Sequence, residues 1–303
     1  MTASLPIGQP VPFRMLIDDA MKLARRHFRA IYLPVAVPLA VMAAVQVVAQ
    51  VKWMAWAQSP RTDVAPFLVR FMLPMILILL VYLLIYVLAY IAMLVAATDA
   101  VMGRAIDMKR AWRFPFQWRV QGTLLRAGVL IFLSFLLLFF PGLYVSLLYS
   151  FIVPVMVEEN TFGSAALRRS SRLVKYNPRR RFVDNPMVKV FAIFFLGWIL
   201  AYAVSMVVQI PLIITQQVLM FRSIAEGQAM EPGALMERLL WLQVPSNVLG
   251  VLAYTAVNLY TSVCLVLFFV DVRRRKEGRD IEAALAEFAG MPAVDPYRPP
   301  PIG

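Results

Sequence analysis

Five long apolar runs alternate along the chain with short charged segments. None of the runs contains Asp, Glu, Lys, Arg or His, and they lie between Arg29 and Lys52, Arg70 and Asp99, Arg126 and Glu158, Lys189 and Arg222, and Arg238 and Asp271. A helix needs about 20 mostly apolar residues to cross about 30 Å of hydrocarbon, because it rises 1.5 Å per residue. The pattern therefore predicts an all-α, polytopic membrane protein.

The third run is longer than one span needs and short for two, with 31 residues between Arg126 and Glu158. Pro141-Gly142 lies near its middle, and this dipeptide interrupts helices and suits a turn. We therefore expect a tight hairpin there and six spans in all. The predicted spans are about 30–51, 71–98, 122–141, 143–158, 189–213 and 246–270, within one membrane domain over residues 1–290.

The distribution of lysine and arginine tests this count, because short cytoplasmic segments of membrane proteins are rich in both. With six spans, 25 of the 30 lysines and arginines fall on the side of the two termini. With five spans, one of the strongly basic segments would face outward. We therefore predict a multi-pass protein of the plasma (inner) membrane, with both termini in the cytoplasm.

Two segments near the ends of the chain lie outside the predicted spans. Residues Phe13 to Ala30 form a basic amphipathic pattern at helical spacing, which predicts a helix along the inner membrane surface that leads into the first span. Residues 291–303 contain five prolines and are predicted to be a disordered tail. The expected fold is thus three helical hairpins with amphipathic interfacial helices.

Composition excludes several classes of protein. The chain has 303 residues, 61% of them apolar, a mean hydropathy of +0.72 and only 16% charged residues, against about 25% in a soluble domain. This argues against a water-soluble or disordered chain, and the single cysteine, Cys264, against a disulfide framework or a cysteine-based zinc site. The net charge of +13 lies at the predicted membrane edges, so we expect no nucleic-acid partner.

Each predicted span that runs towards the cytoplasm ends in a carboxylate: Asp99, then Glu158 and Glu159, then Asp271. The first two endings repeat at an offset of 60 residues, since Asp99-x-x-x-Gly103-x-Ala105 matches Glu159-x-x-x-Gly163-x-Ala165. A negative charge at a helix C-terminus opposes the helix dipole unless a cation compensates it. We expect Asp99, Glu159 and Asp271 each to pair with an arginine and to hold the inner helix ends together. The alternative is that they are solvated residues at the interface.

The basic segments also have two interpretations. They either set the topology and attract anionic lipid headgroups, at about 1 kcal/mol per charge, or they dock a cytoplasmic partner or an acidic headgroup. Residues 164–175 are amphipathic, with Ala165, Leu167 and Leu173 available to the membrane or the bundle. The candidate structural or lipid-facing residues are Asp99, Glu158, Glu159, Arg168, Arg169, Arg172, Asp271, Arg273 and Arg275.

Two stretches resemble a family of bacterial multi-span membrane proteins related to the membrane domain of glycerophosphoryl diester phosphodiesterases. They are Glu158-Glu159-Asn160 with Ala165 to Leu173, and the ending Phe268 to Glu282. The chain departs from the family pattern at Arg279 and in the arginine content of residues 178–182. The resemblance implies this fold and location. It does not imply phosphodiesterase activity, because that chemistry belongs to a separate soluble barrel with histidines, and no histidine follows Asp271.

The sequence offers no catalytic constellation. His27 is the only histidine and lies between Arg26 and Phe28 in the basic amphipathic segment, where a structural role is expected. Nucleotide-binding and zinc-protease motifs are absent. We therefore expect no enzyme activity, no cofactor and no catalytic or metal-binding residues.

A transport function is the main alternative. The spans contain no ionisable groups of the kind that proton relays use, but Thr255, Asn258 and Ser262 share one face of the sixth span at helical spacing. Hydrogen bonds between helices, worth about 0.6 kcal/mol each, also account for such residues.

We conclude from the sequence that the protein is a non-enzymatic membrane module: a scaffold, assembly factor or partner subunit. Its basic cytoplasmic face is expected to contact anionic phospholipid headgroups of the bilayer, a protein partner or a second copy of the chain. The alternative is a channel or carrier for a neutral or amphiphilic solute along the polar face of the sixth span.

Overall fold

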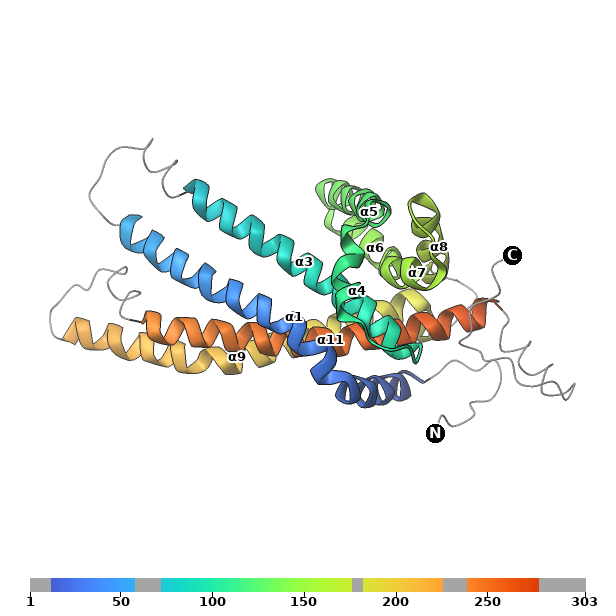
Figure 1. Cartoon of the computed structure of the whole chain (residues 1–303). Coiled ribbons are helices and arrows are strands. Elements are labelled where there is room, and N and C mark those ends of the chain that lie inside the picture. Colours follow the sequence, from blue (N-terminus) through green and yellow to red (C-terminus); the bar gives the residue numbers. More distant parts are fainter. Residues whose placement is uncertain (1–11, 58–71, 176–181, 226–238, 278–303) are drawn as a thin grey trace, which may run out of the picture. The chain divides into compact units, whose positions relative to one another are not determined.

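The computed structural model describes residues 12–57, 72–175, 182–225 and 239–277, and the regular structure in these ranges is entirely helical. The helices of Figure 1 are α1 (Phe13–Ala57), α3 (Leu73–Val101), α4 (Met108–Arg113), η2 (Phe114–Phe116), α5 (Trp118–Leu137), α6 (Phe139–Leu148), α7 (Ile152–Glu159), α8 (Ser164–Val174), η3 (Phe182–Asp184), α9 (Pro186–Ala225) and α11 (Leu240–Glu277). The predicted tail 291–303 and the family-like residues 278–282 lie outside the described residues.

Six helical stretches are long and apolar enough to cross a membrane. They are Phe13–Lys52, Leu73–Val101, Trp118–Leu137, Phe139–Glu159, Pro186–Arg222 and Leu240–Glu277. The prediction of an all-α, multi-pass membrane protein is therefore confirmed. Several helices extend beyond the predicted spans, because a helix continues into polar residues at its ends where no proline or glycine stops it.

The predicted hairpin turn at Pro141-Gly142 is wrong by three residues. The chain breaks at Leu138, whose backbone is extended (φ −162°, ψ 149°), and Pro141 and Gly142 lie in the first turn of α6. Proline is accepted there because the first N–H groups of a helix have no partner within it. Gly142 lies against the ring of Phe135, and a Cβ on it would come within 2.3 Å of a ring carbon. The glycine therefore allows the two limbs to pack closely.

The fourth predicted limb, residues 143–158, is also not one helix. Helix α6 ends at Leu148, and α7 begins at Ile152 after a short turn. Helix α1, in contrast, is a single helix that includes both the amphipathic segment 13–30 and the first predicted span. The apolar side of that segment is buried at Leu16, Ala20 and Ala24.

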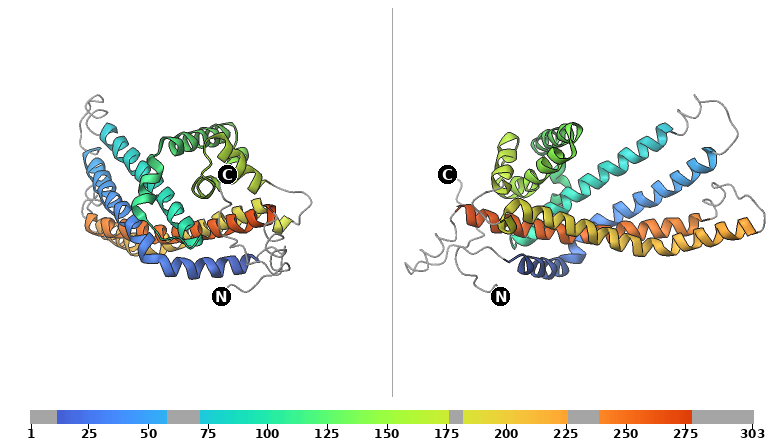
Figure 2. Two further views of the ribbon diagram at one scale, coloured as in Figure 1. Left: turned by 45° about the vertical axis from the view of Figure 1, so that its right-hand side comes forward. Right: turned by 180° about the vertical axis from the view of Figure 1, so that it is seen from behind.

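The chain forms two compact units, each built from several separate segments. Unit 1 consists of residues Met1–Ile31, Ile91–Gly197 and Leu259–Gly303, and it contains the short helices α4 to α8 shown in Figures 1 and 2. Its core includes the ring of Phe151, whose centroid lies 6.0 Å from that of Phe268 and 5.5 Å from that of Phe269. All three rings are fully buried, so they join α11 to the start of α7.

Unit 2 consists of Tyr32–Tyr90 and Trp198–Asn258, which belong to the four long helices α1, α3, α9 and α11. The hydroxyl of Tyr32 donates a 3.0 Å hydrogen bond to the carbonyl of Leu252, and Ser246 Oγ donates to the carbonyl of Val208 at 3.3 Å. Large apolar side chains are exposed along these helices, such as Leu77 (61% exposed) and Val207 (66%). Such apolar surface is unfavourable in water but suits a helix bundle in lipid.

Helices α9 and α11 approach closely within unit 1 at Gly197. A Cβ on Gly197 would lie 2.5 Å from Oγ1 of the buried Thr261. Small residues commonly allow such close helix contact in membrane proteins, since packing and hydrogen bonds drive helix association in lipid.

We predict that Gly197→Ala destabilises the protein by about 1–3 kcal/mol, because the added methyl group overpacks the α9–α11 contact. Gly128→Ala in α5 is the matched control, since nothing lies within 4 Å of its Cβ position. The control is expected to be neutral or slightly stabilising. Thermal unfolding in mild detergent measures both variants, and equal melting temperatures for the two would contradict the close approach.

Candidate functional site

Glu158, the next-to-last residue of α7, is almost completely buried, with 2% of its side chain exposed. One carboxylate oxygen accepts a 2.7 Å hydrogen bond from Arg104, which follows α3 in the chain. The other accepts a 3.3 Å hydrogen bond from Arg273 in α11. This one carboxylate therefore joins three separate segments of unit 1.

Glu159 extends this network to α8. Arg169 donates to both of its carboxylate oxygens, from Nε to Oε2 at 2.8 Å and from Nη2 to Oε1 at 2.9 Å. Arg273 Nε lies 3.5 Å from Glu159 Oε1, and Glu277 of α11 pairs with both Arg169 and Arg273. Such paired, charge-assisted hydrogen bonds fix the direction of the guanidinium group as well as its position.

Asp99, near the end of α3, is the third member of the network. Its side chain is 1% exposed and its carboxylate lies 3.9 Å from Arg104 and 3.6 Å from Arg110. Neither oxygen has a hydrogen-bond partner among the described residues, so Asp99 is held by longer-range attraction. Asp271 pairs with Arg275, four residues further along the same helix.

The predicted pairing of Asp99, Glu159 and Asp271 with arginines is therefore confirmed, and the alternative of solvated carboxylates is wrong. The predicted cross-link between helix ends holds for Asp99 and Glu159, whereas Asp271 pairs with Arg275 on its own helix. We call eight residues the carboxylate–arginine cluster: Asp99, Glu158, Glu159 and Glu277 with Arg104, Arg110, Arg169 and Arg273.

Sequence reasoning missed Arg104, Arg110 and Glu277. Two signals were available: Arg104 directly follows the repeated glycine Gly103, and Glu277 lies four residues after Arg273, the spacing of helical ion pairs. No signal in the sequence indicated that these residues meet at one place.

The repeated glycines Gly103 and Gly163 both have positive φ, at 68° and 66°. Gly103 closes α3, where the N–H of Arg104 donates to the carbonyl of Asp99 at 2.8 Å, as in the common glycine-terminated helix end. Gly163 instead precedes α8, and its N–H donates to Thr123 Oγ1 of α5 at 2.6 Å. The repeat therefore marks two tight turns that direct the chain back to the cluster.

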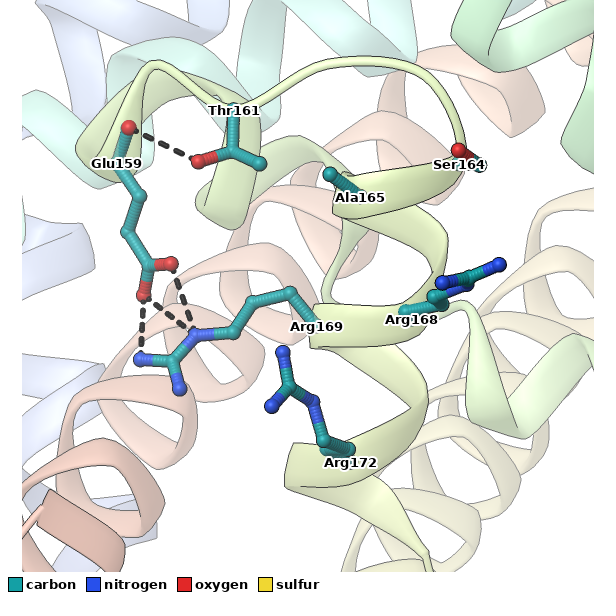
Figure 3. Close-up of a pocket in the computed structure, with 7 residues that line it drawn as sticks. All are labelled: Glu159, Thr161, Ser164, Ala165, Arg168, Arg169 and Arg172. Carbon is teal, nitrogen blue, oxygen red and sulfur yellow. Dashed lines mark hydrogen bonds and ion pairs between the residues drawn. The ribbon is translucent and has the colours of Figure 1, made fainter.

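A pocket of about 470 Å³ lies beside the cluster, between the end of α7 and α8 (Figure 3). Its lining residues are Glu159, Thr161, Ser164, Ala165, Arg168, Arg169 and Arg172. Helix α8 buries Leu167 and Leu173 in the core of unit 1, so these two residues pack against the protein. Its opposite side exposes Arg168 and Arg172.

The three residues of the polar path predicted for the sixth span, Thr255, Asn258 and Ser262, do not line one common cavity. Unit 2 has a cavity of about 220 Å³ lined by Thr255 together with polar residues that include Tyr86, Gln209 and Asn247. Asn258 donates to the hydroxyl of Tyr86 at 3.4 Å but does not line that cavity, and Ser262 is fully buried in unit 1. Thr255 Oγ1 donates to the carbonyl of Val251 in its own helix.

Charge is divided unequally between the two units. The described part of unit 1 holds 20 lysines and arginines and nine aspartates and glutamates, an excess of 11 positive charges. The described part of unit 2 holds Lys52 and Arg222 and no acidic residue. Every described lysine or arginine that the sequence assigns to the cytoplasmic side lies in unit 1.

No family model, no curated protein and no solved structure matches the chain. The resemblance to the membrane domain of glycerophosphoryl diester phosphodiesterases therefore stays a prediction. Within the described residues, no group of three His, Cys, Asp or Glu side chains is placed to hold a metal ion.

We predict that Glu158→Gln destabilises the protein by about 3 kcal/mol, because it breaks a buried ion pair. This value is the lower end of the range for such pairs, and we choose it because the partner Arg104 is one-third exposed. The variant keeps the shape of the side chain and removes the charge that compensates Arg104 and Arg273.

Asp19→Asn is the control, because Asp19 and Lys22 form an exposed pair at 3.9 Å, which contributes less than about 1 kcal/mol. Thermal unfolding in detergent compares the two variants. Equal stability losses would show that burial does not strengthen the contacts of Glu158.

Proposed function

We propose that this protein is a non-enzymatic integral membrane module of the plasma (inner) membrane, with unit 1 at the cytoplasmic side and both termini in the cytoplasm. In this proposal the basic surface of unit 1 contacts anionic phospholipid headgroups, and the protein serves as a scaffold or partner subunit. The observation that best supports it is the division of charge, with 20 described lysines and arginines in unit 1 and two in unit 2.

The pairing of the acidic residues strengthens this argument. The carboxylates of the cluster are occupied by Arg104, Arg110, Arg169 and Arg273 inside unit 1. Many of the remaining cations, such as Arg25, Arg29 and Arg113, are exposed on its surface. Exposed cations attract anionic lipid with about 1 kcal/mol per charge near the membrane surface. Internal neutralisation therefore leaves the positive excess where a lipid headgroup can reach it.

The same contacts favour a structural role over catalysis or transport. Both carboxylate oxygens of Glu158 accept hydrogen bonds from guanidinium groups, and the side chain is only 2% exposed, so this carboxylate is engaged within the protein rather than presented to a substrate. A solute path along the sixth span would need its polar residues to share one cavity, and of Thr255, Asn258 and Ser262 only Thr255 lines the cavity of unit 2.

Tryptophan fluorescence tests the lipid preference of each unit. Trp118 belongs to unit 1 and Trp241 to unit 2, and both are exposed. Full-length variants that keep only one of these tryptophans, with the others replaced by Phe, are reconstituted in mixed vesicles. Quenching by brominated phosphatidylglycerol is then compared with quenching by brominated phosphatidylcholine.

We expect the anionic lipid to quench Trp118 more strongly than the zwitterionic lipid does, and the difference to shrink in 1 M salt, where charges are screened beyond about 3 Å. Trp241 is the matched control and should show no preference. An equal quenching ratio at the two sites would contradict the proposed lipid-binding face.

A further inference from the structure

The pocket between α7 and α8 carries more positive charge than its single carboxylate can compensate. It is lined by Arg168, Arg169 and Arg172 and by one acidic residue, Glu159. Arg169 is engaged by both oxygens of Glu159 and also by Glu277. The lining residues therefore have an excess of two positive charges.

Arg168 and Arg172 supply this excess. They lie four residues apart on the exposed side of α8, and neither guanidinium has a hydrogen-bond or ion-pair partner among the described residues. Like charges at this spacing repel each other and destabilise a helix. In Figure 3 Arg172 extends towards Arg169, while Arg168 points away from Glu159. Because Arg168 is exposed, a change of rotamer can bring it over a bound anion.

A neutral hydroxyl group adds to the lining. Ser164 lies one turn before Arg168 at the first position of α8, whereas the hydroxyl of Thr161 on the preceding loop donates to the carbonyl of Glu159 at 3.0 Å. No side chain caps the N-terminus of α8, because Gly163 occupies the cap position. The free N–H groups of a first helical turn favour an anion, and here they adjoin a pocket that the arginines already make positive.

We propose that this pocket binds the phosphate monoester headgroup of a lipid of the phosphatidate type. Arginine binds phosphate oxygens in pairs of parallel hydrogen bonds, and a phosphate monoester carries a charge of about −1.5 to −2 at neutral pH. This charge matches the excess of two, whereas a phosphodiester carries a single negative charge. The volume of about 470 Å³ is in the range of small-molecule sites.

The neighbouring helix favours a lipid over a soluble phosphate. The hydrogen bond from the Gly163 N–H to Thr123 fixes the start of α8 beside α5. Helix α5 exposes Leu125 two residues further on, and it is one of the stretches apolar enough to cross a membrane. A headgroup in the pocket would thus have its acyl chains next to an apolar helix.

This inference rests on the proposed function, because it needs unit 1 to lie at a membrane surface. The test measures lipid retention by native mass spectrometry of the full-length protein. The probes are phosphatidate, phosphatidylglycerol and phosphatidylcholine with identical chains. The unmodified protein should retain one phosphatidate roughly tenfold better than phosphatidylglycerol, since the monoester forms more charge-assisted bonds.

Arg168→Gln/Arg172→Gln should reduce phosphatidate retention about tenfold or more without lowering the melting temperature, because both side chains are exposed and unpaired among the described residues and their mutual repulsion is removed. The matched control is Arg25→Gln/Arg29→Gln in α1, which removes two exposed arginines at the same spacing. The control should keep the roughly tenfold preference for phosphatidate over phosphatidylglycerol, because removing two cations from the general basic surface lowers the retention of both anionic lipids alike. If the double variant does not fold, Arg168→Gln alone is expected to show an intermediate loss.

Equal retention of phosphatidate and phosphatidylglycerol would overturn the assignment of a monoester. An equal loss in the two double variants would overturn the pocket while leaving a general preference for anionic lipid intact. No preference for either anionic lipid over phosphatidylcholine would overturn the proposed function as well. Inorganic phosphate at millimolar concentration is added as a competitor: retention that persists supports the lipid source, and complete displacement overturns it in favour of a soluble phosphate.

Discussion

The buried carboxylate of Glu158 is the contact on which the arrangement of unit 1 depends. It lies where α7 ends and accepts hydrogen bonds from Arg104 after α3 and from Arg273 in α11. Removing one partner of a buried ion pair leaves an uncompensated charge in a medium of low dielectric constant, which is far more costly than losing a surface pair. Segments that are distant in the sequence must therefore meet at this point or leave a charge unpaired.

The remaining features of the candidate site follow from this constraint. Glu159, the next residue, is directed towards α8 and fixes Arg169, so α8 is held beside α7 through the same cluster. Leu167 and Leu173 fill the core on one side of α8, which leaves Arg168 and Arg172 on the other side. The cluster is neutral within itself, whereas the surface of unit 1 keeps its positive excess. This separation is what suits unit 1 to an anionic membrane surface.

The sequence was sufficient to predict six apolar helical stretches of membrane-spanning length and the pairing of carboxylates with arginines, because both follow from local rules. A run without ionisable residues must avoid water, and a carboxylate at a helix C-terminus needs a cation. The turn at Leu138 could not be predicted, because Pro141-Gly142 is compatible with a turn and also with a first helical turn. The close contact between Gly142 and the ring of Phe135 favours the position in the first helical turn. That contact forms only when α5 and α6 pack together, so the sequence alone does not show it.

The sequence also does not show which arginine pairs with which carboxylate. Basic residues are so frequent in the segments 104–126 and 168–189 that spacing alone does not select Arg104 for Glu158 or Arg169 for Glu159. Contacts made across more than 100 residues, such as that between Glu158 and Arg273, decide it. The pocket beside α8 likewise depends on which arginine the cluster engages and which it leaves exposed.

A double-mutant cycle on Glu158 and Arg273 tests the central claim most directly, that this buried pair holds unit 1 together. The free energy of unfolding is measured in detergent for Glu158→Gln, Arg273→Gln and the double variant. We predict that the double variant loses at least about 1 kcal/mol less stability than the sum of the single losses, within the range found for directly interacting residues. Losses that add to within about 0.5 kcal/mol would contradict the claim, because independent residues behave in that way.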